Sequence, residues 1–161
     1  MPLPPQRFRP ACADRGFLVR RFQASGQEIE SHPVVLAVEG PLSTIAFFLV
    51  ALVALLHAWF LVLEMFLWTK PLGLKTFRNT LEHAQASATL AANQGLYNGF
   101  LSAGLVWGLL TSPPSQALAV KTFFLLCVIV AGAYGAMTVS KRIFFIQAVP
   151  AILALMILLL S

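Results

Sequence analysis

A histidine and a glutamate interrupt a long apolar stretch near the middle of the chain. They are His57 and Glu64, in the segment HAWFLVLEMFLW. Their spacing corresponds to about two helical turns, which puts both side chains on one side of a helix. Ionisable groups inside a membrane are costly and usually serve a purpose, such as binding a ligand or moving a proton. Both residues are therefore candidates for a functional site.

A second polar group lies in the segment AANQGLYNGF. Its members are spaced four residues apart in two pairs, which gives two adjoining polar stripes on a helix: Asn93, Gln94, Tyr97 and Asn98. Three carboxamides and a phenol cannot all face lipid cheaply. We expect His57 and Glu64, on the preceding antiparallel helix, to be their partners. The pattern predicts a polar seam between two helices.

Simpler interpretations exist for both ionisable residues. Glu64 lies one turn before Trp68, a residue typical of the headgroup region, so its carboxylate could reach water. His57 could be a core histidine that is satisfied locally. Two candidate ligands without further partners do not indicate a metal site, and no cofactor is expected.

Small residues accompany the polar segment. Gly95 and Gly99 form a GxxxG arrangement, and Gly132 and Gly135 are each paired with an alanine four residues away. Such glycines allow helices in a membrane to approach closely. We interpret all four as packing residues.

The composition identifies the class of protein. The chain has 161 residues, of which 58% are hydrophobic and only 11% are charged, whereas soluble domains are about a quarter charged. Apolar runs of roughly 20 residues recur, and each is long enough to cross a bilayer as a helix. We predict an all-α, polytopic membrane protein whose transmembrane domain, residues 42–161, is a four-helix bundle with spans at about 42–68, 88–110, 117–139 and 143–160.

Local signals refine these spans. Asn79 and Glu82 resemble a capping box that would start the second helix near Thr80. Pro150 is expected to kink the fourth span, because proline lacks the N–H group of a regular helix.

Residues 1–41 form a polar tail with five arginines and no apolar stripe. Near the spans, basic residues gather in the first and third connections, which predicts that both termini lie outside the cytoplasm. The tail arginines conflict with this orientation. A natural start downstream, near Val34 or Val38, would remove the conflict. The basic residues form no single nucleic-acid-binding surface, so the net charge of +5 is better explained by membrane topology.

Four segments also carry a resemblance to a known family: HAWFLVLEMFLWTKPLGLKTF, LAANQGLYNGFLSAGLVWGLL, FFLLCVIVAGAYGA and QAVPAILAL. In order and spacing they resemble the bacterial family of small membrane proteins known as domain of unknown function 1304. The resemblance covers residues 43 to 160 and implies four transmembrane helices in a bacterial inner membrane. It implies no activity and no catalytic residue.

The residues are compatible with four functions. The clustered carboxamides beside a carboxylate favour a binding site for a small amphipathic or lipid-like ligand between the first two helices. A small proton-coupled transporter using Glu64 is the first alternative. A third possibility is an accessory subunit whose glycine faces dock a partner membrane protein or a second copy. A membrane-embedded enzyme, with Glu64 or His57 as general acid or base, is the least supported.

Overall fold

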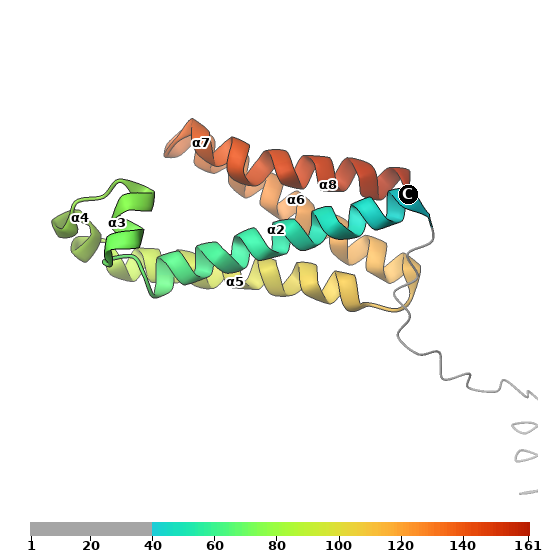
Figure 1. Ribbon diagram of the computed structural model, residues 1–161, viewed down its shortest axis with the longest axis horizontal. Helices are drawn as coiled ribbons and strands as arrows, with labels where there is room; N and C mark the ends of the chain where they lie inside the picture. Colours follow the sequence, from blue (N-terminus) through green and yellow to red (C-terminus); the bar gives the residue numbers. More distant parts are fainter. Residues whose placement is uncertain (1–39) are drawn as a thin grey trace, which may run out of the picture. The chain divides into compact units, whose positions relative to one another are not determined.

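The computed structural model describes residues 40–161, which form helices and turns without a strand in this part of the chain. The predicted polar tail, residues 1–41, lies outside the described residues except for Gly40 and Pro41. The predicted start near Val34 or Val38 also lies outside them. Figure 1 shows three long helices and a segmented last helix that run beside one another, with two short helices at one end: α2 (Pro41–Met65), α3 (Pro71–Phe77), α4 (Leu81–Ala86), α5 (Ala88–Leu110), α6 (Pro114–Thr138), α7 (Lys141–Ile143), η1 (Phe144–Ala148) and α8 (Val149–Leu160).

Within residues 40–161, three helices are long and apolar enough to cross a membrane: α2, α6 and the continuous helix Lys141–Leu160. The prediction of an all-helical fold is confirmed for this part of the chain, with three candidate spans. Helix α5 is 23 residues long, but its hydropathy is too low for it to count as a candidate span. Its three carboxamides, its tyrosine and its glycines lower the hydropathy of the predicted second span.

The apolar core lies between α2, α5, α6 and α8. On α2, the buried positions Val50, Val53 and His57 are spaced by three or four residues, so they form one stripe along the helix. This stripe meets a cluster of buried apolar residues from the other three helices, among them Leu105, Leu125, Val128, Ala151 and Ala154. The alanines of α8 let that helix approach closely.

Helices α2 and α5 form the most extensive helix pair in the described fold. They are antiparallel, and Gly95 and Gly99 of α5 face α2. A Cβ atom on Gly95 would lie 2.7 Å from Met65 Cγ and 3.0 Å from Glu64 Cβ, and one on Gly99 would lie 2.5 Å from Leu61 Cδ1. Because nonbonded carbon atoms normally stay about 3.5–4.0 Å apart, no side chain fits at these positions without a shift.

The last helix is irregular, as its proline requires. Pro150 cannot donate a backbone hydrogen bond, and its ring clashes with the carbonyl four residues earlier. The helix accommodates the proline with a π turn at Phe144–Ala148, in which the Val149 N–H donates to the Phe144 carbonyl. The widened turn presses against α6, where a Cβ on Gly132 would lie 2.9 Å from the Ala148 backbone nitrogen. Gly135 similarly faces Ile143.

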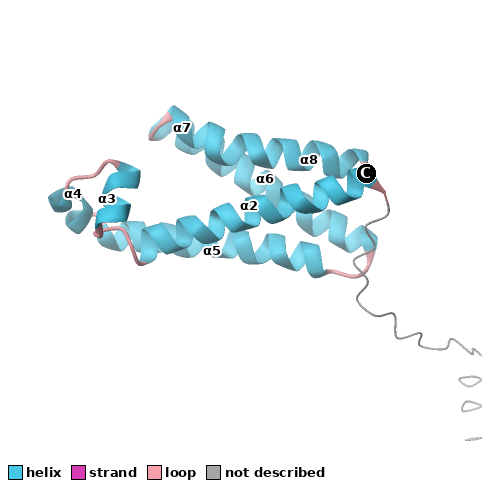
Figure 2. Ribbon diagram, in the orientation of Figure 1, coloured by secondary structure: helices cyan, strands magenta, loops and turns pink. Residues whose placement is uncertain are grey.

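The connection between α2 and α5 differs from the sequence prediction. Helix α2 ends at Met65 rather than Trp68, and Pro71–Phe77 forms the additional helix α3. The predicted cap at Asn79 is wrong, because the Thr80 side chain accepts the His83 N–H and is the N-cap of α4. The loops lie at the helix ends (Figure 2).

Trp68 fastens this connection to the start of α5. Its ring lies 4.7 Å from that of Phe77, centroid to centroid, and its Nε1 donates to Ser87 Oγ at 3.2 Å. Ser87 is the residue at which α4 ends and α5 begins. Trp68 is thus a loop residue that links the end of α2 to the beginning of α5.

We predict that Gly95→Val destabilises the protein by about 1–3 kcal/mol, because the added atoms overlap Met65 and the Glu64 stem. Thermal unfolding of the purified chain in detergent measures the effect. Ala103→Val is the matched control, since Ala103 lies on the exposed side of the same helix. Equal unfolding temperatures for the two variants would contradict a close α2–α5 contact.

Candidate polar site between α2 and α5

Glu64 is the buried acidic side chain among the described residues, with an exposed fraction of 4%. It lies in the last turn of α2, opposite Gly95 of α5. Because Gly95 has no side chain, the backbone of α5 lies directly against the Glu64 stem. The carboxylate therefore projects along the surface of α5 toward residues that flank the glycine.

Two amides of α5 donate to this carboxylate, one to each oxygen. Gln94 Nε2 lies 3.0 Å from Glu64 Oε1, and Asn98 Nδ2 lies 2.7 Å from Glu64 Oε2. The two donors are four residues apart, which places them one helical turn apart on the same side of α5. Hydrogen bonds to a charged acceptor are shorter and stronger than neutral ones, and the Asn98 bond falls in that range.

No ion pair involves Glu64 within residues 40–161. Besides Glu64, the described charged residues are Glu82 and six cations: Lys70, Lys75, Arg78, Lys121, Lys141 and Arg142. All of the cations except Lys121 lie in connections or near helix ends. Lys121 lies on α6, which starts at the opposite end of α5 from Glu64. Each carboxylate oxygen thus accepts one hydrogen bond from a neutral amide, and no described cation pairs with the group.

His57 does not join the predicted seam. Its side chain is 1% exposed, and Nδ1 lies 2.8 Å from the Val53 carbonyl of its own helix. The Phe60 ring contacts it edge-on at 5.8 Å between centroids. The expectation that His57 pairs with the polar residues of α5 is therefore wrong, and the core-histidine interpretation describes its contacts.

Asn93 and Tyr97 lie on the outer side of α5. Asn93 is exposed and Tyr97 has an exposed fraction of 56%. The Tyr97 ring packs beside Phe100 at 6.3 Å between centroids. Within the described part of the chain neither side chain is hydrogen-bonded. Gln94 is exposed as well, so the polar residues extend from the buried carboxylate to the surface of the helix.

A hydrogen bond that the sequence did not indicate strengthens the same helix pair. Ser102 Oγ donates to the Ala54 carbonyl at 2.9 Å. Ser102 follows Asn98 by one helical turn, so its position on the polar face could have been read from the spacing. Its acceptor could not, because the backbone carbonyls of a helix are already paired and carry no sequence signal.

The described residues contain no group of three His, Cys, Asp or Glu side chains close enough to hold a metal ion. The chemistry of the site is that of one carboxylate and its two amide donors. Such a set can accept hydrogen bonds, hold a cation or exchange a proton.

The described residues form an all-helical fold with three helices long and apolar enough to cross a membrane, and a buried carboxylate lies between two of its helices. A family described as "Protein of unknown function (DUF1304)" matches residues 51–159, so the chain belongs to this family. A bacterial relative is the uncharacterised protein YpaA of Lactococcus lactis subsp. lactis (strain IL1403). It is 34% identical over 106 residues, which are 65% of this chain and 87% of the relative. No solved structure matches the chain.

We predict that Asn98→Ala lowers the free energy of unfolding by about 1–3 kcal/mol, because it removes the donor to a buried charged oxygen. Gln94→Ala should have a smaller effect, since water or a headgroup can replace an exposed amide. Chemical unfolding in mixed micelles gives both values. A double-mutant cycle with Glu64→Gln should show a coupling of about 0.5–3 kcal/mol for Asn98, and additivity would exclude the contact.

Proposed function

We propose that the chain is a four-helix membrane protein that binds a small amphipathic ligand at Glu64, between α2 and α5. The ligand's head is a hydrogen-bond donor with a positive charge. The observation that carries this proposal is a carboxylate that is 4% exposed, accepts hydrogen bonds from two neutral amides and has no cationic partner among residues 40–161.

The packing of α5 supports a fourth span. Helix α5 runs antiparallel to α2, which is apolar enough to cross a membrane, and contacts it along its length. At 23 residues α5 extends about 34 Å, compared with about 30 Å of hydrocarbon. A helix paired along its length with a membrane-spanning helix lies at the same depth in the membrane as its partner. Its polar residues then need partners inside the membrane, and Glu64 supplies two of the contacts.

The uncompensated charge supports a cationic head. A carboxylate in surroundings of low dielectric attracts a cation more strongly than it would in water, and the attraction repays desolvation when hydrogen bonds are also made. An ammonium group carries both a charge and N–H donors. It can replace the Gln94 amide at Oε1 while Asn98 keeps Oε2.

The surface around Gln94 supplies a route and an apolar contact. Gln94 is exposed, and its neighbours Asn93 and Tyr97 have polar groups without partners in the described structure. Leu96 and Phe100 are exposed on the same helix. A ligand head can therefore enter among polar groups while its tail lies on apolar side chains, as is common in binding sites for small molecules.

We predict that dodecylammonium binds to the full chain in nanodiscs at least roughly tenfold more tightly than dodecanoate, and that Glu64→Gln removes this preference. Glutamine keeps the size and shape of the side chain but lacks the charge, and its single oxygen can accept from only one of the two amides. Isothermal titration calorimetry provides the dissociation constants.

Glu82→Gln is the matched control for this experiment. It removes the same charge from α4, where Glu82 is exposed, and should bind like the wild type. If Glu64→Gln keeps the preference, or if Glu82→Gln loses it equally, the proposed ligand site is wrong.

The same isolated carboxylate favours one alternative function, the proton-coupled export of a lipophilic cation. Transport requires that the Glu64 carboxylate bind a proton and the cationic substrate in turn. Uptake of tetraphenylphosphonium into proteoliposomes under an imposed pH gradient tests this alternative. Binding of dodecylammonium without such uptake supports a binding protein, whereas uptake that Glu64→Gln abolishes supports a transporter.

The distribution of charge supports a fixed orientation in a bacterial inner membrane, with both termini outside the cytoplasm. Five described cations lie at the end of the fold that carries α3 and α7, namely Lys70, Lys75, Arg78, Lys141 and Arg142. The other ends of the long helices carry only Lys121. Connections rich in lysine and arginine stay on the cytoplasmic side.

We predict that a membrane-impermeant maleimide applied to intact spheroplasts labels Ser161→Cys but not Thr76→Cys. Both variants are made in a chain in which the native cysteines are replaced by serine. Thr76 is exposed on α3, so permeabilised cells should give equal labelling of the two. Labelling of Thr76→Cys in intact spheroplasts would reverse the orientation.

A further inference from the structure

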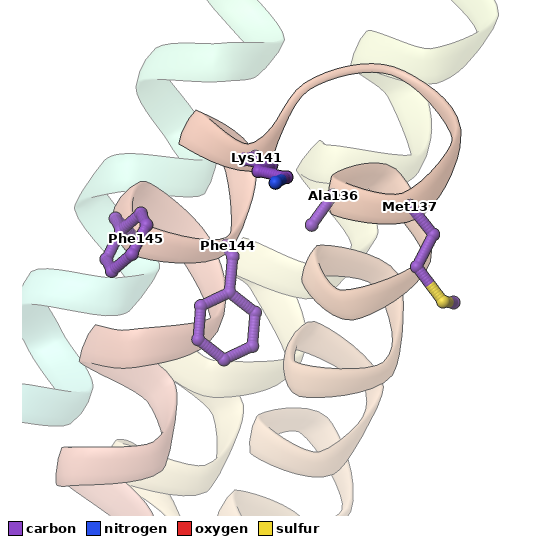
Figure 3. Close-up of a pocket in the computed structure, with 5 residues that line it drawn as sticks. All are labelled: Ala136, Met137, Lys141, Phe144 and Phe145. Atoms are coloured by element: carbon purple, nitrogen blue, oxygen red, sulfur yellow. The ribbon is translucent and has the colours of Figure 1, made fainter.

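A pocket opens at the turn between α6 and the last helix, apart from the polar site on α5. It has a volume of about 420 Å³ and is lined by Ala136, Met137, Lys141, Phe144 and Phe145. Figure 3 shows Lys141 and Ala136 beside the connecting turn, with the Phe144 ring further along between the two helices. The pocket is therefore apolar along its length and cationic at the end near the turn.

The π turn contributes to the form of this pocket. Phe144 and Phe145 are the first two residues of η1, whose wider backbone displaces them relative to a regular helix. On the other side, α6 offers Ala136, a small side chain, and Gly135 lets Ile143 pack close to α6. Met137 and Phe145 are 78% and 68% exposed and extend the apolar wall outward.

The cationic end has no acidic partner in the described structure. Lys141 and Arg142 are both exposed, and no ion pair involves either of them within residues 40–161. The two described acids lie elsewhere, because Glu64 is bonded to amides of α5 and Glu82 lies on α4. Lys141 lines the end of the apolar pocket near the turn, and Arg142 follows it in the chain. Positive charge at one end of an apolar pocket matches a ligand with an anionic head and a hydrocarbon tail.

We propose that this pocket binds an anionic phospholipid, whose phosphate contacts Lys141 and Arg142 and whose acyl chain lies along Phe144 and Met137. Charge complementarity selects the headgroup, and basic residues at the ends of membrane helices are a general feature of such sites. The apolar wall distinguishes Lys141 from Lys70 and Lys75, which do not line this pocket.

Native mass spectrometry of the full chain in detergent tests the proposal. Dioleoylphosphatidylglycerol and dioleoylphosphatidylcholine are added at equal concentration, so that only the headgroup differs. We expect roughly a tenfold excess of the phosphatidylglycerol adduct for the wild type, and a ratio near one for the double variant Lys141→Gln and Arg142→Gln. The double variant Lys70→Gln and Lys75→Gln loses the same charge at the same end of the helices and should keep the excess.

Two results would overturn the proposal: equal adducts of the two lipids on the wild type, or the same loss of preference in both double variants. Thermal unfolding supplies a second measurement. Phosphatidylglycerol should raise the unfolding temperature of the wild type but not that of the Lys141 and Arg142 double variant, whereas inorganic phosphate should leave the wild type unchanged. An equal rise with inorganic phosphate would assign the site to a free anion and refute lipid binding.

Discussion

A carboxylate inside an apolar helix requires hydrogen-bond donors from a neighbouring helix, and this requirement sets the arrangement of α2 and α5. Glu64 accepts from Gln94 and Asn98, which fixes both the rotation of α5 about its axis and its register along α2. A slip of one residue would turn both amides away from the carboxylate. Gly95 lies between the two donors and allows the backbones to meet at this depth. The polar contact and the close packing therefore depend on each other.

The sequence predicts the helices well where hydrophobic runs end at prolines or polar turns. The second predicted span, 88–110, has the same bounds as α5, because two prolines close it and polar residues precede it. The end of α2 could not be predicted, since Phe66 and Trp68 are as apolar as the helix before them. Trp68 leaves the helix because its ring and its N–H find Phe77 and Ser87 in the folded connection, and those partners are known only once the chain is folded.

For the candidate site, sequence spacing identifies the residues but not which of them meet. Glu64, Gln94 and Asn98 come together, whereas His57 uses a carbonyl of its own helix. Periodicity gives the direction of a side chain only to within about half of the helix circumference. By that measure His57 and Glu64 lie on the same side of α2. The difference between them arises from α5, whose glycines and amides are opposite Glu64. A histidine can satisfy itself within one helix, whereas a carboxylate needs donors that a helix interior lacks.

The modest hydropathy of α5 has a consequence for biosynthesis. Transfer of a single segment with three carboxamides from water to lipid is unfavourable, because each amide loses hydrogen bonds to the solvent. The ribosome makes α2 before α5, so the Glu64 carboxylate is already available when Gln94 and Asn98 emerge. In the proposed arrangement with α5 as a fourth span, an amide that binds this carboxylate while entering the lipid would exchange one set of hydrogen bonds for another. The order of the helices along the chain would then favour the joint insertion of α2 and α5 as a hairpin.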